Sequence, residues 1–308
     1  MQRLFKVKII KGSFLKEHVM KTGYKVIVAA SVMLAAQSAS ALVIDSTTTD
    51  GNALATALVG SGVTISNVNY YGGSNQSGFF SGGAGVLGID NGLIMTTGSA
   101  LEAPGPNNSD GTTGNRGVGG GAGDADLNAL IPQSTNDAAV LTFDFTTDTG
   151  DLFFNYVFAS EEYNEYVNSN FNDVFAFFVD GVNIAKAPDG QAVSINNVNC
   201  EGAAPNCSVF NNNDPSEGAP LFDIEYDGFT DKLLASFLGL GAGTHQMKIA
   251  IADAGDSVLD SAVFLEGGSF SGNEPTPVPE PGVLGLMALG LGGLMAARRR
   301  RNSGMLSA

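Results

Sequence analysis

The sequence has few of the residues that zinc sites and the active sites of serine hydrolases require. It has no tryptophan, two cysteines and two histidines in 308 residues. Because His18 falls in an N-terminal segment that is expected to be removed, the two thiols have only His245 as a possible nitrogen partner, which is too few ligands for a structural zinc site. The Gly-x-Ser-x-Gly sequence of a nucleophile elbow is also missing.

Positive charge is scarce between the two ends of the chain. Residues 42–297 contain 30 acidic residues and 4 basic ones (Arg116, Lys186, Lys232 and Lys248), so this part carries a net charge of −26. Phosphate binding requires clustered lysine and arginine, so nucleic acids and anionic lipids are disfavoured as partners. The acidic surface is compatible with divalent cations, and an alternative is that it only keeps an exported protein soluble.

The N-terminal residues 1–41 have the layout of a secretory signal peptide, with a possible true start at Met20. A basic beginning is followed by the apolar run 26–36 and by Ala39-Ser40-Ala41 as a small-residue cleavage site. The pattern predicts export and cleavage by signal peptidase, with a mature chain that starts near Leu42.

The longest apolar run near the C-terminus, 282–297, has about sixteen residues and is short for a membrane-spanning helix, which prefers ~20. It follows a Pro-rich spacer over 271–278 and the tripeptide Pro-Glu-Pro, and it is followed by four arginines. The flanking signal residues are Pro279, Glu280, Pro281, Arg298, Arg299, Arg300 and Arg301. Arginines after the helix predict a cytoplasmic C-terminus.

This C-terminal arrangement over 279–301 resembles the PEP-CTERM sorting signal of Gram-negative bacteria. The resemblance implies export across the inner membrane, transient anchoring by a transmembrane helix over 282–297, and recognition by an exosortase. Cleavage near Pro279–Pro281 would then release the protein to the cell surface or extracellular matrix. The alternative is a permanent anchor in the inner membrane.

The residues between the ends predict an all-β domain over 42–270. Short runs rich in Phe, Tyr, Val and Ile alternate with Gly, Asn and Asp turns, which is typical of an antiparallel β-sandwich of jelly-roll type. Expected strands are 63–70, 92–96, 138–146, 152–158, 174–179, 221–226, 233–238, 244–253 and 261–270. Asp50 is expected to cap a helix over 52–59, and a second short helix is expected over 124–130.

An acidic loop lies between two of the expected core strands, 152–158 and 174–179. It contains Glu161, Glu162 and Glu165 and ends at Asp173, and these carboxylates repel one another unless a cation neutralises them. A second acidic segment, 253–260, adds three more. The candidate Ca²⁺ ligands are Glu161, Glu162, Asp173, Asp253, Asp256 and Asp260. The pair Asp124 and Asp126 is a possible third group. The alternative is that these residues form turns and helix caps.

Two segments of this acidic region carry a family resemblance. Phe158-Ala-Ser-Glu-Glu-Tyr163 and Asn172-Asp-Val-Phe-Ala-Phe-Phe178 resemble the signature of the choice-of-anchor L family, and 88–98 and 251–265 also fit. The resemblance covers roughly 53–270. It implies an extracellular β domain of bacteria that occurs with several kinds of C-terminal anchor.

The two cysteines, Cys200 and Cys207, are close in sequence and would reach an oxidising compartment after export. We therefore expect a local disulfide that closes a loop.

Three classes of function remain on the sequence alone. The first is a calcium-stabilised surface or matrix protein with a structural, adhesive or biofilm role and no enzyme activity. The second is a lectin-like module for exopolysaccharide or cell-surface glycan, with Tyr70, Tyr71, Phe79 and Phe80 as a stacking platform. The third, a glycoside hydrolase, is least favoured, because Glu161 and Glu162 would point to opposite faces of a strand.

Overall fold

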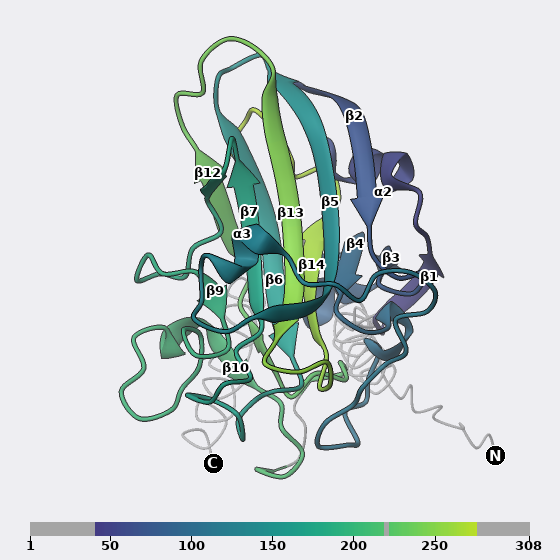
Figure 1. The fold of residues 1–308 in the computed structure, drawn as a ribbon, viewed down its shortest axis with the longest axis vertical. Helices are drawn as coiled ribbons and strands as arrows, with labels where there is room; N and C mark the ends of the chain where they lie inside the picture. The colour runs from purple at the N-terminus through teal and green to yellow at the C-terminus, as the bar shows by residue number, and fades with distance from the viewer. Residues whose placement is uncertain (1–40, 219–221, 276–308) are drawn as a thin grey trace, which may run out of the picture.

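Two antiparallel sheets face each other in the computed structural model, which describes residues 41–218 and 222–275 (Figure 1). In the first sheet the order is β1 (Val43–Thr47), β3 (Ser77–Ser81), β4 (Asn91–Thr96), β14 (Ser261–Glu266), β6 (Leu152–Ser160), β11 (Gly228–Thr230) and β10 (Phe210–Asn212), with β12 (Leu233–Phe237) also paired to β6. In the second the order is β2 (Val63–Tyr71), β5 (Thr135–Thr147), β13 (His245–Ala254), β7 (Val174–Val179) and β8 (Val182–Asn183), with β9 (Val193–Ser194) paired to β7.

Aromatic side chains fill the space between the sheets. Phe154 of β6 and Phe177 of β7 meet edge to face with ring centroids 4.4 Å apart, and Phe270 packs against Phe154 at 5.8 Å. Edge-to-face geometry is favourable for aromatic pairs, and each buried ring also removes a large apolar area from water. The phenylalanine-rich strands therefore form the inner core of a sandwich.

The outer faces of the central strands are covered as well. On the first sheet, Val157 and Phe264 pack beneath loop residues such as Ile224. On the second sheet, Val140 and Phe178 lie in one cluster with Leu127 of the short helix α3 (Ala125–Asn128), which crosses this sheet in Figure 1. Burial on both faces explains why β6 and β7 are almost continuously apolar in sequence.

The helix α2 (Gly51–Leu58) begins as the sequence predicts. The side chain of Asp50 accepts hydrogen bonds from the backbone N–H groups of Asn52 (3.0 Å) and Ala53 (3.3 Å), which otherwise lack partners at a helix start. Leu54 and Leu58 then turn into the inner core.

The structure confirms the antiparallel β-sandwich with two short helices, and corrects one expected strand. The described part of 221–226 forms only an isolated bridge between Ile224 and Pro104. The Asn213 side chain donates to the carbonyls of Ile224 and Tyr226, and the backbone N–H of Phe222 donates to its Oδ1. Side-chain bonds of this kind replace a strand ladder.

The edge strand β2 is interrupted along its length. Its register with β5 shifts between Ser66 and Asn69, and Asn67 adopts a φ of 52°. The Nδ2 group of Asn67 donates to Asp144 at 2.7 Å, so the irregularity is fixed by a hydrogen bond to the neighbouring strand.

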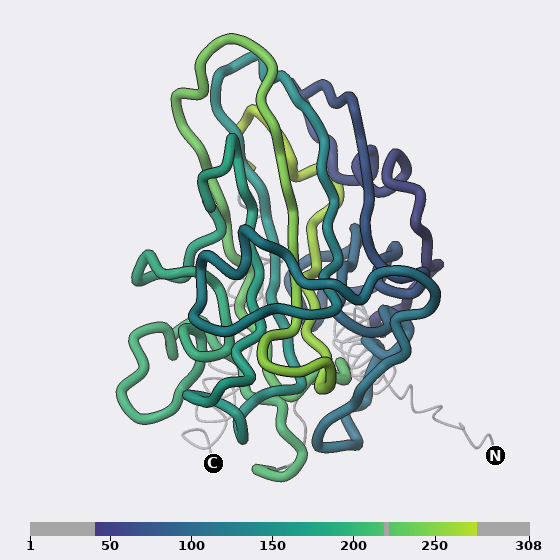
Figure 2. Tube along the Cα trace, viewed as in Figure 1, coloured from purple at the N-terminus to yellow at the C-terminus, as the bar shows by residue number. Residues whose placement is uncertain are grey.

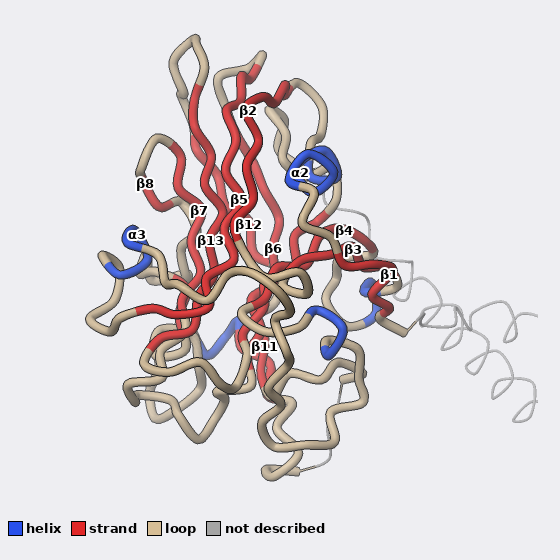
Figure 3. Tube along the Cα trace, turned by 45° about the vertical axis from the view of Figure 1, so that its right-hand side comes forward, coloured by secondary structure: helices blue, strands red, loops and turns tan. Residues whose placement is uncertain are grey.

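Loops gather at one end of the sandwich, the lower end in Figure 2 and Figure 3. We call the segments 103–116, 161–173, 195–218, 222–227 and 255–260 the loop end. Hydrogen bonds join them: the backbone N–H of Leu259 donates to Thr113, and that of Asp260 donates to the carbonyl of Thr112. The expected disulfide between Cys200 and Cys207 is present here, with the Cα atoms 4.4 Å apart.

Several predicted segments fall outside the described residues. These are residues 1–40 of the signal peptide, the helix over 282–297 and the sorting residues 279–281 and 298–301. Within 41–218 and 222–275, none of the helices has the length and apolar character needed to span a membrane.

Candidate metal centre

Strand β6 delivers two adjacent glutamates to the loop end. The strand ends at Ser160, which pairs with Gly228 and Ser261, and Glu161 and Glu162 follow it directly. Both are buried, with 2% and 1% of their surface exposed. The two side chains have different acidic neighbours, because Glu161 lies near Asp227 and Glu162 lies near Asp173. The loop end therefore contains two separate clusters of carboxylate side chains.

The first, which we call the Asp173 group, consists of Glu162, Asp173 and Asp253. Asp173, next to the start of β7, accepts hydrogen bonds from the N–H of Ala254 (2.8 Å) and the hydroxyl of Ser261 (2.6 Å). A register shift in β13 between Ile251 and Asp253 turns the fully buried Asp253 toward it.

Asp253 lacks the hydrogen bonds that a buried carboxylate needs. Neither of its oxygens has a partner of ordinary geometry among the described residues, although the Thr97 hydroxyl lies near. The outer oxygen of Glu162, Oε2, is also buried without a partner in this part of the chain. An unpaired buried charge is strongly unfavourable, so these oxygens are positioned to receive a proton or a cation.

The pKa values of these carboxyl groups are raised, because burial and neighbouring negative charges disfavour their ionised forms. Burial, and then the charge of Asp173, raises the pKa of Glu162 to about 9 and places that of Asp253 well above its ordinary value. Burial also raises the pKa of Asp173 to about 7. At neutral pH the Asp173 group must therefore keep protons or bind a positive ion.

In the described ranges, no basic side chain forms an ion pair with Glu162, Asp173 or Asp253. The ion pairs found there are Arg116–Asp137 (3.2 Å), Lys232–Glu266 (3.6 Å), Lys248–Asp124 (2.7 Å), Lys248–Asp126 (2.6 Å) and His245–Asp180 (2.7 Å). Each of these cations has its acidic partner outside the Asp173 group. The possible third metal group, Asp124 and Asp126, is thus paired with Lys248, and Asp124 also caps α3.

The remaining predicted ligands are placed differently. Asp260 accepts hydrogen bonds from the backbone N–H groups of Gly114 and Ser99, which supports a turn-forming role. Asp256 is partly exposed, and its negative charge contributes to the raised pKa of Glu162. Glu161 faces the second carboxylate group. Of the six candidates, Glu162 and Asp253 each lie near Asp173, but the three do not bring one oxygen each within 4.8 Å of one another in the described part of the chain.

The second group, which we call the Asp227 cluster, contains Asp110, Glu165 and Asp227. One carboxylate oxygen from each residue lies within 4.8 Å of the others. Sequence reasoning placed Glu165 in the acidic loop but missed Asp110 and Asp227. The available signals were two runs of oxygen-bearing side chains, Asn107-Asn-Ser-Asp110 and Asn211-Asn-Asn-Asp214, that the fold brings to the same end.

The expected aromatic platform for sugar stacking is not formed. Phe80 is 1% exposed and packs on the outer face of the first sheet, while Phe79 packs against the inner core. The hydroxyl of Tyr70 is buried, and Tyr71 is 39% exposed. Successive residues of a strand point to opposite faces, so Phe79 and Phe80 cannot form one stacking surface, and each is packed against a different core cluster.

Comparison with protein families identifies two segments. Residues 43–271 match the model of the Choice-of-anchor L domain, and residues 277–301 match the PEP-CTERM protein-sorting motif. Comparisons with curated proteins and with solved structures find no match. The chain therefore belongs to the choice-of-anchor L domain family and carries a PEP-CTERM motif that directs it to the surface of a Gram-negative bacterium.

Proposed function

We propose that this chain is a calcium-stabilised protein of the cell surface or extracellular matrix, with a structural, adhesive or biofilm role and no enzyme activity. Signal peptidase would remove 1–41, and an exosortase would process the sorting motif that lies at 277–301. Calcium would bind at the loop end after export.

The unpartnered carboxylate oxygens of the Asp173 group carry this proposal. The group offers only oxygen ligands, which favours calcium over the metals that prefer nitrogen or sulfur. Extracellular calcium modules typically have dissociation constants of about 10⁻⁴–10⁻³ M. A cation would neutralise buried charge and satisfy oxygens that otherwise lack partners.

The positions of the ligands suggest what such a cation would stabilise. Glu162 lies just after β6 of the first sheet, whereas Asp173 immediately precedes β7 and Asp253 lies in β13, both strands of the second sheet. An ion bound by Asp173 together with Glu162 would link the two sheets at the loop end. Calcium would then resist separation of the sandwich layers.

Melting curves of the purified protein in calcium and in EDTA test the proposal. Calcium at 100 times its dissociation constant stabilises by about 2.7 kcal/mol, which corresponds to a Tm gain of about 5–10 °C for a domain of this size. Glu162→Gln removes a ligand charge and should lose most of this gain. In EDTA its Tm should stay close to that of the wild type, because a raised pKa of about 9 keeps the Glu162 carboxyl protonated at neutral pH and glutamine is likewise uncharged.

Glu201→Gln is the matched control, since Glu201 is an exposed acid of the same loop end. It should keep the full calcium-dependent gain. Equal gains in Glu162→Gln and Glu201→Gln, or no gain in the wild type, would rule out calcium at the Asp173 group.

A further inference from the structure

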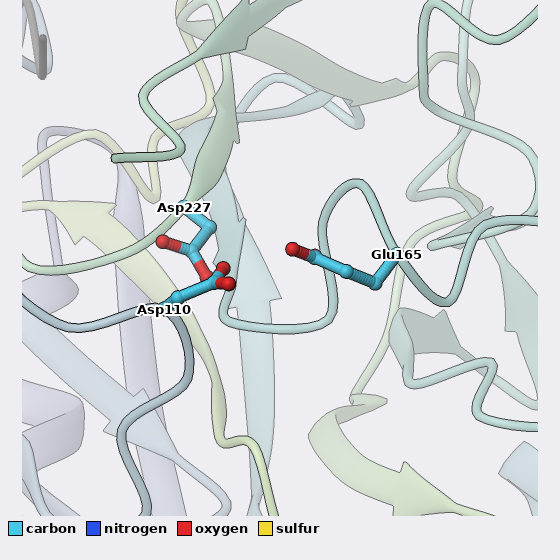
Figure 4. Close-up of side chains that lie close together, drawn as sticks. All are labelled: Asp110, Glu165 and Asp227. Atoms are coloured by element: carbon cyan, nitrogen blue, oxygen red, sulfur yellow. The ribbon is translucent and has the colours of Figure 1, made fainter. Parts of the chain in front are cut away.

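The Asp227 cluster joins three loops that are distant in sequence. Asp110 lies in the loop before α3, Glu165 in the β6–β7 loop, and Asp227 immediately before β11. Figure 4 shows the carboxylates of Asp110 and Asp227 side by side, with that of Glu165 pointing toward them. Three like charges in this arrangement repel one another, so their convergence needs a compensating group.

Asp227 is the fixed member of the cluster. The Nδ2 group of the buried Asn107 donates to its Oδ1 at 2.7 Å, which holds the carboxylate in one orientation. Its other oxygen, Oδ2, is fully buried and receives no hydrogen bond from an amide, hydroxyl or basic group in the described chain.

Among residues 41–218 and 222–275, the neighbours of Asp227 supply further oxygens, and no ion pair to a basic side chain is found there. The carboxyl of Glu161 lies within hydrogen-bonding reach of Asp227, a contact that needs either a shared proton or a cation. Oε2 of Glu161, Oδ1 of Asn107 and Oδ2 of Asp214 are buried and also lack partners among the described residues. The site is therefore rich in oxygen atoms that have no hydrogen-bond donor.

We propose that Asp110, Glu165 and Asp227 bind a Ca²⁺ ion at a second site, separate from the Asp173 group, with Glu161 as an additional oxygen ligand. Calcium–oxygen bonds of 2.3–2.6 Å place ligand oxygens at most about 5 Å apart across the ion, which matches the 4.8 Å limit found here. The ligands come from flexible loops and include no nitrogen or sulfur. Calcium tolerates such irregular oxygen shells better than magnesium does.

The two sites differ in what they would stabilise. The Asp173 group lies between the sheets, whereas Asp110 and Glu165 are exposed and belong to loops. An ion at the Asp227 cluster would pull these loops onto the buried Asp227 and would keep contact with solvent. The arrangement of the loop end would therefore follow the external calcium concentration. This inference does not depend on calcium binding at the Asp173 group.

Calcium titration calorimetry and hydrogen exchange of the full chain in mild detergent test the second site. Asp110→Asn and Glu165→Gln change exposed side chains, so they should leave the fold intact. Each should weaken one calcium-binding step at least tenfold and abolish the calcium-dependent protection of amides in 103–116. Asp227→Asn, which retains an oxygen acceptor for Asn107, should eliminate that step.

Asp223→Asn is the matched control, because Asp223 is an exposed acid four residues from Asp227 and outside the cluster. It should bind calcium as the wild type does. Glu162→Gln should remove the other binding step and leave protection of 103–116 in place. The proposal is overturned if Asp110→Asn and Glu165→Gln bind calcium unchanged, or if Asp223→Asn weakens binding to the same extent.

Discussion

His245 has an acceptor on each of its ring nitrogens. Nδ1 lies 2.7 Å from Asp180 Oδ2, and Nε2 lies 2.8 Å from the carbonyl oxygen of Gly241. A neutral imidazole can donate from only one nitrogen, so this arrangement favours the protonated ring. Hydrogen bonds to Asp180 and Gly241 accordingly raise the pKa of His245 above 6.5.

The pH dependence of this pair follows from the two pKa shifts. The raised pKa of His245 contributes stability that is present below the unfolded value near 6.5 and is lost as the pH rises through the folded value. The pKa of Asp180 is lowered, chiefly by the Gln246 N–H, so its contribution appears above the unfolded carboxyl pKa and is lost as the pH falls through the folded value. The pair should stabilise most in the mildly acidic range between them.

NMR titration of the imidazole can measure this shift directly, because His18 is the only other histidine in the sequence and lies in the segment that is expected to be removed. We expect the His245 pKa to fall toward 6.5 in Asp180→Asn and to stay raised in the control Asp148→Asn. A wild-type value at or below 6.5 would contradict the assigned hydrogen bonds.

The sequence predicts candidate site residues only where acids are neighbours along the chain. Glu161 and Glu162 stand out because they interrupt two apolar runs. Asp227 does not, because the residue that orients it, Asn107, is 120 positions away. The contact between Asn107 and Asp227 arises because the fold brings two distant loops together, and the local pattern of apolar and polar residues does not predict this.

At the level of elements, the cap of α2 offers a test of local sequence chemistry. Asp50→Ala removes the acceptor for two backbone N–H groups at the helix start. We expect a loss of about 1 kcal/mol and a Tm decrease of about 2–4 °C.

Asp50→Asn is the control for this change, because asparagine caps helices about as well as aspartate does. Its Tm should stay close to that of the wild type. Equal destabilisation by Ala and Asn would mean that the charge, rather than the hydrogen bonds, stabilises the helix start.

The elements that could be predicted are those with strong apolar patterns. The expected strand 174–179 is β7, and 152–158 is the main part of β6. Strands β1 and β3 were missed, because the first is mostly polar or exposed and the second has Ser and Gly positions. The three-residue strands β10 and β11 are too short for any periodic signal.

For the whole molecule, the sorting motif makes a prediction about location. Glu280→Ala alters the centre of Pro279-Glu-Pro281 within the matched segment 277–301. We expect the full-length chain to accumulate in the membrane fraction of the producing cell, because the processing enzyme would no longer recognise it. Fractionation followed by immunoblotting measures the ratio of membrane-bound to released protein.

Glu274→Ala is the control, since it removes an acid from the preceding spacer and lies outside the matched segment. It should mature as the wild type does. If Glu280→Ala were also released normally, processing at this motif would not depend on its glutamate.

The interruption at Asn67 has a consequence for how two copies of this chain can meet along an outer edge. An unbroken outer strand presents a row of free amide and carbonyl groups along which a second copy can extend the sheet into a fibre. In β2 this row is displaced between Ser66 and Asn69. A second copy would therefore meet a discontinuous template along β2, which hinders growth of the sheet at this edge.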